Sequence, residues 1–293
     1  MLSAAPPAGP ELRGAYRHCA RVTRRSGSSF ASTFWMLPPP RRRALQAVYA
    51  FCRLADDIAD DPTVRGDRSL LLRRWREELE NAYRGKPTHP VGIALGDAVH
   101  RFQLPESVFQ ELLRGVESDL RAEPIDSFDD LARYCYRVAS TVGLLVVRVL
   151  GYHNPRSLEY ARAMGIAVQL TNVLRDVGED AASGRIYLAR EDLERMGVEP
   201  ERLARRQMSD ELRLVLAVYA ERARIHYDRA AALLPREDRW TLRAAEAMGR
   251  IYRELLDELQ RRGFPCLEGS LRLPRSRRVT IAAAAFLGLG SRP

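Results

Sequence analysis

Two pairs of aspartates are the residues of this chain best suited to chemistry. Asp56 and Asp60 stand four positions apart, and so do Asp176 and Asp180. Side chains at that spacing project from the same face of an α-helix. Two like charges placed in this way destabilise an isolated helix by about 0.2–0.5 kcal/mol, so a neutralising cation is expected beside them. Carboxylate oxygens are the preferred ligands of hard divalent cations such as Mg²⁺.

Each aspartate pair continues a polar stripe along its helix. The first stripe is Tyr49, Arg53, Asp56 and Asp60, and the second is Gln169, Asn172, Asp176 and Asp180. Apolar residues flank both stripes. Because buried polar groups are costly unless they are paired, this pattern indicates the lining of a cavity. The alternative is that both stripes are solvated helix faces, and the matching of two stripes argues against it.

If the two stripes face each other, Mg²⁺ ions can bridge their carboxylates to a substrate diphosphate. Such ions would neutralise the charge that develops on diphosphate as a carbon–oxygen bond breaks. Arg53 and Arg175 can hold phosphate oxygens in fork geometry. The alternative for either arginine is a salt bridge within its own helix.

A third segment, residues 134–143 (YCYRVASTVG), combines aromatic with small side chains. Small residues allow close helix packing or leave space for a bulky apolar ligand. Aromatic rings stabilise a nearby cation by about 0.5–2 kcal/mol. Core packing is the alternative for Tyr134 and Tyr136, and the same ambiguity applies to Phe30 and Tyr252.

Helical periodicity runs through almost the whole chain, and no segment alternates with the period of a strand. The pattern therefore predicts an all-α fold. The predicted helices cover residues 11–25, 41–60, 67–84, 90–102, 105–120, 127–150, 155–181, 189–196, 208–234 and 237–262.

Bulk composition predicts one cytoplasmic domain. The chain has 293 residues, of which 46% are hydrophobic, and no Gly/Ser linker interrupts it. Residues 1–10 look disordered and lack the features of a signal peptide. The four scattered cysteines favour structural thiols in a reducing compartment over a zinc site. The net charge of +9, mostly from arginine, suits contact with phosphates of a substrate, a lipid or a nucleic acid.

The C-terminal tail is apolar over residues 279–289, which is too short to span a bilayer. Arginines precede this stretch at positions 272, 275, 277 and 278. A peripheral contact with the inner face of a membrane is therefore one interpretation. The alternative is a terminal helix that packs on the domain.

Taken together, these motifs resemble those of the squalene/phytoene synthase family. The segments that carry the resemblance are 28–30 (SSF), 49–60 (YAFCRLADDIAD), 134–143, 169–180 (QLTNVLRDVGED) and 184–188 (GRIYL). They occur in the family's order, and the resemblance covers about residues 12–275. It implies a catalytic domain at 11–275, followed by a basic and apolar tail at 276–293.

The resemblance implies an isoprenoid-synthase helical bundle around a central cavity, in which two prenyl diphosphates are joined head to head with Mg²⁺, or Mn²⁺ in its place. Carried over by motif, the metal ligands are Asp56, Asp60, Asn172, Asp176 and Asp180. The residues implied to line the diphosphate and prenyl sites are Ser29, Phe30, Arg53, Gln169, Asn172, Arg175, Arg185, Tyr187 and Tyr252. Tyr49 and Tyr134 are expected to assist cation and proton handling.

Within that family the chain looks most like bacterial presqualene diphosphate synthases of hopanoid biosynthesis, which use farnesyl diphosphate. The grounds are residues 28–30, 35–39 (WMLPP) and 272–274 (RLP). Ser26 and Ala189 depart from the family's usual histidine and proline. NADPH and nucleic acid are not expected as partners, whereas downstream isoprenoid enzymes are.

Four alternatives stay open at this point. Two lie within the family: a phytoene synthase that uses geranylgeranyl diphosphate, and a squalene synthase that reduces its intermediate with NADPH. A third is a head-to-tail prenyltransferase or terpene cyclase. The fourth is a basic helical protein that binds membrane or nucleic acid without catalysis.

Overall fold

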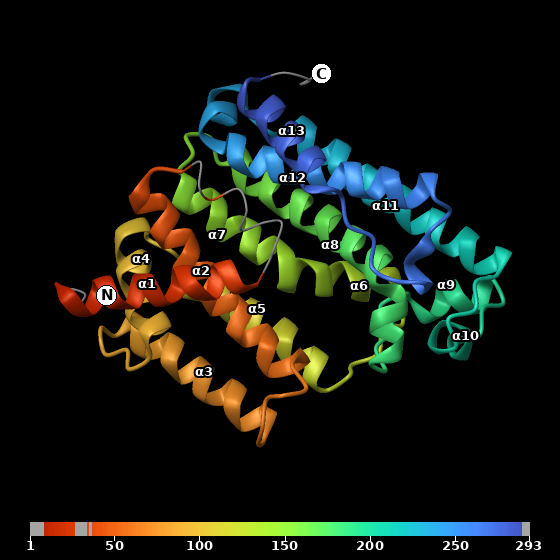
Figure 1. The fold of residues 1–293 in the computed structure, drawn as a ribbon, viewed down its shortest axis with the longest axis horizontal. Coiled ribbons are helices and arrows are strands. Elements are labelled where there is room, and N and C mark those ends of the chain that lie inside the picture. The colour runs from red at the N-terminus through yellow and green to blue at the C-terminus, as the bar shows by residue number, and fades with distance from the viewer. Residues whose placement is uncertain (1–8, 27–33, 35–36, 289–293) are drawn as a thin grey trace. The chain divides into compact units, whose positions relative to one another are not determined.

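A computed structural model describes residues 9–26, 34 and 37–288 of the chain. All regular elements in these ranges are helices (Figure 1). The predicted all-α fold is confirmed. Internal contacts divide the chain into two compact units, which are described separately. The first unit comprises Met1–Arg121 and Leu144–Tyr152, and the second comprises Ala122–Gly143 and His153–Pro293.

The complete helices among the described residues of the first unit are α1 (Pro10–Arg25), α2 (Pro39–Asp60), α3 (Arg68–Tyr83), α4 (Pro90–Phe102) and α5 (Glu106–Leu120). Helix α2 carries the first aspartate pair. It begins at Pro39, where a proline costs no hydrogen bond because the first helical N–H groups have no intrahelical acceptor. Helix α3 is capped by Asp67, whose side chain accepts from the backbone N–H groups of Ser69 and Leu70.

Aromatic packing fixes α2 within the first unit. The ring of Phe51, fully buried on α2, stacks on Trp75 of α3 with 5.1 Å between ring centroids. Phe109 of α5 meets Phe51 edge-on at 5.4 Å. The indole nitrogen of Trp75 donates to the backbone carbonyl of Phe51, 3.2 Å away, so this large side chain is buried without an unpaired donor.

The second unit is built around one long helix, α8 (Arg156–Ala182), which carries the second aspartate pair. The other elements of this unit are α6 (Phe128–Cys135), a π-helical turn (Tyr136–Ser140), α9 (Arg190–Arg195), α10 (Pro200–Ala204), α11 (Asp210–Leu233), α12 (Arg239–Arg261), α13 (Arg275–Phe286) and two 3₁₀ turns (Arg236–Asp238 and Pro265–Leu267). Helices α11 and α12 both pack against α8.

Buried polar groups on α8 are paired within this packing. The hydroxyls of Thr171 on α8 and Tyr227 on α11 lie 2.9 Å apart, and both residues are buried. At the start of α8, the carboxylate of Asp238 accepts from the hydroxyl of Ser157 at 2.6 Å. It also accepts from the backbone N–H groups of His153 and Asn154. These bonds fix the position from which α8 begins.

Most predicted helices match the structure to within two residues at each end. The clearest difference concerns the predicted helix at 127–150. It is divided into α6, the π-helical turn Tyr136–Ser140 and α7 (Thr141–Leu150). Helix α7 begins in the second unit and ends in the first. Periodicity missed the break because a π turn adds one residue to a continuous helix without a proline to mark it.

The C-terminal tail forms a helix of its own. Helix α13 packs along α12, and Ala285 is its buried residue. Among the described residues, no helix is both long enough and apolar enough to cross a membrane. All four cysteines are buried, and none forms a disulfide. Residues 1–8, the larger part of the segment predicted to be disordered, lie outside the described residues.

Candidate active site

The first acidic stripe lies on the last turns of α2. Asp56 is partly buried there, and Asp60 is exposed one turn later. Burial, followed by the negative charge of Asp60, raises the pKa of the Asp56 carboxyl to about 8. A carboxyl group with this shift is poised to release its proton when a cation arrives. A cation-binding role for this end of α2 stays a prediction.

Arg53 lies on the same helix but neutralises a different carboxylate. Its guanidinium pairs with Asp57 at 2.6 Å, which is the intrahelical salt bridge considered from the sequence. Arg53 is exposed, and the pair is accordingly weak. Tyr49, two turns before Asp56, packs edge-on against Phe34 with 6.3 Å between centroids. Ser29 and Phe30 lie outside the described residues.

In the second acidic stripe, on α8, Asp176 is paired with an arginine and a serine. Arg175 forms a two-point pair with Asp176, in which Nε to Oδ1 is 2.7 Å and Nη2 to Oδ2 is 2.5 Å. The hydroxyl of Ser270 donates to Oδ1 of Asp176 at 2.9 Å. Tyr252 on α12 also hydrogen-bonds to Arg175. Three predicted residues, Arg175, Asp176 and Tyr252, thus meet at one place.

Sequence reasoning missed Ser270. This residue lies 94 positions after Asp176, in the loop between the second 3₁₀ turn and α13, and no short motif links the two. The loop is brought to α8 by close packing at Gly178. A Cβ added to Gly178 would lie 2.7 Å from the carbonyl oxygen of Cys266 and 2.9 Å from the Cα of Leu267. A glycine one turn beyond the arginine-aspartate pair is the one sequence signal that another segment approaches there.

The side-chain amide of Asn172, one turn before Asp176, is only partly hydrogen-bonded. Its amide nitrogen donates to Oε1 of Gln169 at 3.1 Å. Its amide oxygen is buried and finds no hydrogen-bond partner within the described part of the chain. A buried acceptor left in this way costs about 1–3 kcal/mol unless a ligand satisfies it. Amide oxygens are ligands for hard cations, so this atom fits an ion bound beside Asp176.

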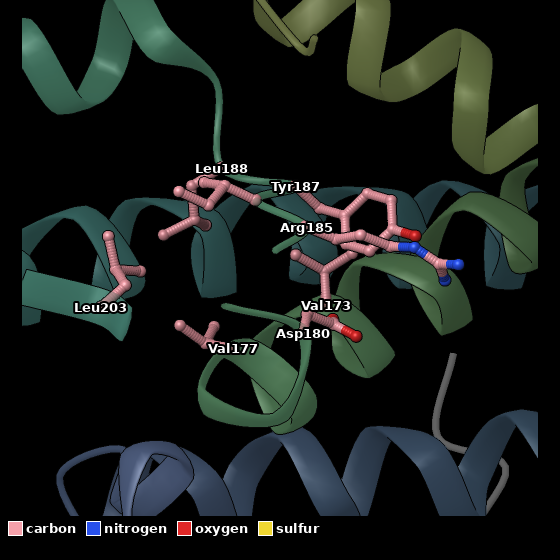
Figure 2. Close-up of a pocket in the computed structure, with 8 residues that line it drawn as sticks. Val173, Val177, Asp180, Arg185, Tyr187, Leu188 and Leu203 are labelled. Atoms are coloured by element: carbon pink, nitrogen blue, oxygen red, sulfur yellow. The ribbon is translucent and has the colours of Figure 1, made fainter. Parts of the chain in front are cut away.

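The C-terminal end of α8 borders a small pocket in which polar and apolar side chains meet (Figure 2). Its lining residues are Val173, Val177, Asp180, Arg185, Ile186, Tyr187, Leu188 and Leu203. Figure 2 shows the ends of Asp180, Arg185 and Tyr187 on one side and Leu188 and Leu203 on the other. The chain turns back at Gly184, and the backbone N–H of Arg185 donates to the carbonyl of Asp180. This turn places Arg185 beside the last predicted metal ligand.

Tyr134 and Tyr187 form the aromatic part of the site in the second unit. Their rings stack with 4.8 Å between centroids and 21° between planes, and Tyr134 is buried. Tyr134 is the residue before the last of α6, close to the π-helical turn, a kind of irregularity that is frequent at functional sites. Tyr134 also belongs to the buried core of this unit, against which Tyr187 packs, so core packing stays the alternative for it.

The donor set fits Mg²⁺ better than a closed protein-only metal site. No group of three or more His, Cys, Asp or Glu side chains gathers closely enough among the described residues to hold a metal alone. Magnesium commonly takes one or two carboxylates and completes its shell with water and substrate phosphate. Asp56 and Asp60 belong to the first unit, and Asn172, Asp176 and Asp180 to the second. That these two sets face each other stays a prediction.

Comparison with known proteins places the chain in a family. The sequence pattern described as "Squalene/phytoene synthase" matches residues 23–281. The chain belongs to the squalene/phytoene synthase family. The match includes the acidic stripes of α2 and α8, the segment at 134–143 and the pocket loop at 184–188.

Several curated relatives carry the name phytoene synthase. Phytoene synthase 3 of Zea mays is 34% identical over 286 residues, which cover 94% of this chain and 66% of that protein. The 15-cis-phytoene synthase of Synechococcus elongatus is 32% identical over 291 residues, which cover 94% of both chains. This chain spans 60–66% of the length of the maize and Arabidopsis thaliana relatives.

Solved structures of the same fold carry other names. A dehydrosqualene synthase in complex with a ligand superposes with a TM-score of 0.85 at 30% identity, covering 96% of this chain and 99% of that one. The squalene synthase HpnC from Alicyclobacillus acidocaldarius superposes with a TM-score of 0.77 at 31% identity, covering 88% of this chain and 97% of that one. Both superpositions cover most of each chain.

Proposed function

We propose that this protein joins two prenyl diphosphates head to head, and that farnesyl diphosphate serves as both substrates to give presqualene diphosphate. The observation that carries the proposal is the acidic stripe of α8. There a buried, unpartnered oxygen of Asn172 lies one turn from the carboxylate of Asp176, in a chain of this family. A bound cation and diphosphate explain this stripe better than exposure of the helix face to solvent does.

The proposed reaction uses the side chains of both units. Mg²⁺ bound by the aspartates and Asn172 would supply positive charge to the leaving diphosphate. Arg175 and Arg185 bind diphosphate oxygens, for which a planar guanidinium is well matched. As the C1–O bond of the first substrate breaks, diphosphate leaves with the bonding electrons and an allylic cation forms. The stacked rings of Tyr134 and Tyr187 offer it a π face away from water.

The second substrate completes the product. Its C2–C3 double bond attacks C1 of the cation, and loss of one proton closes the cyclopropane of presqualene diphosphate. The proton passes to the leaving diphosphate, directly or through the hydroxyl of Tyr49 or Tyr134. The second diphosphate stays attached, so the atoms of two substrates equal those of presqualene diphosphate, one inorganic diphosphate and one proton. No reductant is consumed, in line with a reaction that does not need NADPH.

A phytoene synthase is the second candidate, and the names of the plant and cyanobacterial relatives favour it. Two structural neighbours with squalene-type names favour the farnesyl substrate instead. Both candidates use the same acidic stripes and differ in the length of the prenyl chain. They also differ in the product, because presqualene diphosphate keeps one diphosphate group and phytoene keeps none, so a comparison of substrates and products tests the proposal directly.

The decisive experiment offers the purified protein farnesyl or geranylgeranyl diphosphate with Mg²⁺, with and without NADPH, and identifies products by mass spectrometry. Presqualene diphosphate from farnesyl diphosphate without NADPH supports the proposal. Phytoene from geranylgeranyl diphosphate supports the second candidate, and squalene formed only with NADPH indicates a reductive enzyme. A product that requires isopentenyl diphosphate would contradict head-to-head coupling altogether.

A further inference from the structure

The surface of the second unit exposes three large apolar side chains near its C-terminal helix. Leu287 is 73% exposed, Trp240 is 70% exposed and Val279 is 58% exposed. Trp240 belongs to the first turn of α12, whereas Val279 and Leu287 belong to α13 or follow it directly. Large apolar side chains that cluster on a surface commonly mark an interaction site.

Contacts around Arg243 gather these residues into one patch. The guanidinium of Arg243 lies 3.8 Å from the ring centroid of Trp240 and 4.5 Å from that of Phe286. Leu287 follows Phe286 directly. We call Trp240, Arg243, Phe286 and Leu287 the aromatic edge. The aromatic edge joins the start of α12 to the end of α13, and these two helices run side by side (Figure 1).

The outward face of α13 extends this patch. Val279, Ala283 and Leu287 are exposed at a spacing of four residues, so they share one side of the helix. The opposite side packs on α12, as the buried Ala285 and the ion pair between Arg277 and Glu254 show. Helix α13 thus presents an apolar stripe to the outside, although its length of 12 residues is about 18 Å and too short to span a bilayer.

The charge of α13 and of the segment before it has a single sign, whereas Glu237 and Glu254 on neighbouring elements are acidic and Glu254 pairs with Arg277. From Gly269 to the end of the chain there is no aspartate or glutamate, whereas arginine occurs at 272, 275, 277, 278 and 292. At the other end of the patch, Glu237 accepts a hydrogen bond from the side chain of Asn154, and Asp238 is buried at the start of α8. An anionic partner is therefore favoured by charge complementarity.

We propose that the aromatic edge and the outward face of α13 dock on an anionic lipid surface. Tryptophan suits the boundary between headgroups and acyl chains because its ring is apolar and its N–H is polar. Arg243 beside it and the exposed Arg272 and Arg275 at the start of α13 bind headgroup phosphates, and Val279 and Leu287 enter the acyl boundary. A nucleic acid would use the arginines but would leave the aliphatic side chains in water. The proposal is independent of which prenyl diphosphate the protein uses.

Co-sedimentation with vesicles tests the docking surface. The full chain is mixed with vesicles of phosphatidylcholine alone or of phosphatidylcholine with phosphatidylglycerol. We expect binding to the anionic vesicles, weakened by salt, and at least tenfold weaker binding after Trp240→Ser with Leu287→Ser. Arg272→Glu with Arg275→Glu should weaken it by about tenfold or more. Leu214→Ser, which changes an exposed apolar residue of α11, is the matched control and should bind as the unchanged protein does.

Tryptophan fluorescence gives a second readout. Of the three tryptophans, Trp75 is buried, Trp35 lies outside the described residues and Trp240 is on the proposed surface. Anionic vesicles should shift the emission to shorter wavelength, and brominated acyl chains should quench it. Trp240→Phe should remove both changes while vesicles still sediment the protein. Thermal melting and diphosphate release without vesicles should be the same for all of these variants.

Three results would overturn the proposal. The first is equal binding to neutral and anionic vesicles, and the second is an equal loss of binding in Leu214→Ser. The third is tight retention of a DNA duplex that the Trp240 and Leu287 changes do not affect, which would assign the arginines to nucleic acid. Inorganic pyrophosphate in excess distinguishes a headgroup surface from a simple phosphate site. It should release the protein fully from the vesicles only if the arginines form a simple phosphate site.

Discussion

At the scale of single residues, Asp56 and Asp176 lie at similar positions on their helices but have different surroundings. Burial and Asp60 favour the protonated form of Asp56, whose pKa is raised to about 8. Asp176 instead has both carboxylate oxygens engaged by Arg175 and Ser270. A cation could therefore be bound by proton release at the first site and by exchange of partners at the second.

Replacing either aspartate by asparagine should nearly abolish turnover. Asp56→Asn and Asp176→Asn each remove a negative charge proposed to bind Mg²⁺, and we expect a loss in kcat/KM of about 10²–10⁴-fold. Asp61→Asn is the matched control, because Asp61 is bonded to Thr63 at the end of α2. Diphosphate release measured over a range of Mg²⁺ concentrations checks this. Activity near that of the unchanged protein in both variants would refute the assignment.

Ser270 should act as a positioning residue for Asp176. Ser270→Ala removes a hydrogen bond to a charged group, worth about 1.5–3 kcal/mol, so activity should fall about tenfold or more. The Mg²⁺ concentration for half-maximal activity should rise, and binding of Mn²⁺ followed by its paramagnetic signal should weaken. Ser270→Thr, which keeps the hydroxyl, should restore both. Equal losses in the exposed control Ser276→Ala would indicate a general defect instead.

At the scale of elements, α8 packs closely against the π-helical turn. Gly165 lies against the π-helical turn, where an added Cβ would be 2.4 Å from the Cα of Ser140 and 2.5 Å from its nitrogen. These are backbone atoms that cannot move aside independently. The close approach brings Tyr134, just before the turn, to its place beside α8.

Gly165→Ala should therefore destabilise the protein by about 1–3 kcal/mol or more, measured by chemical unfolding. Gly14→Ala in α1 is the control, because a Cβ there meets nothing within 4 Å. Alanine favours a helix over glycine by up to about 1 kcal/mol, so the control should be neutral or stabilising. A neutral result for Gly165→Ala would mean that α8 and the π turn do not pack this closely.

The start of α8 should make stability depend on acid pH. Burial alone would raise the pKa of Asp238, but hydrogen bonds from Ser157, Asn154 and His153 outweigh it and lower the pKa to about 2. A carboxyl group with a lowered folded pKa stabilises the fold above its ordinary value near 4, and this contribution is lost as pH falls towards 2.

Asp238→Asn should therefore lower the free energy of unfolding at pH 7 by about 2–3 kcal/mol. The difference in this free energy between the variant and the unchanged protein should become smaller as the pH falls from about 4 to about 2. Unfolding free energies measured at several pH values check this. A constant difference across that range would show that Asp238 does not carry the pH dependence.

At the scale of the whole molecule, the proposed function needs side chains from both compact units. A ligand that is bound by both should stabilise the folded chain as a whole. We expect Mg²⁺ with an unreactive farnesyl diphosphate analogue to add about 2.7 kcal/mol at 100 times its dissociation constant, and to raise the melting temperature by several degrees. Mg²⁺ alone should give a smaller shift, and Asp176→Asn should lose most of it. An equal shift in that variant would contradict binding at the second stripe.

Sequence patterns predicted the helices, both acidic stripes and the family. The reason is that helical periodicity and the spacing of like-charged residues are local properties, readable over a few turns. The salt bridge of Arg53 with Asp57 was also anticipated as an alternative, because it depends only on spacing within one helix.

Tertiary structure alone decided which partners complete those stripes. Ser270 reaches Asp176 across 94 positions, Tyr187 stacks on Tyr134, and Arg243 joins Trp240 to Phe286. Such contacts depend on which helix faces pack together and on how loops return between them, and no local period encodes that. The sequence by itself thus determined the kind of chemistry and the helices that carry it. The packing of distant segments determined which side chains surround each charged group.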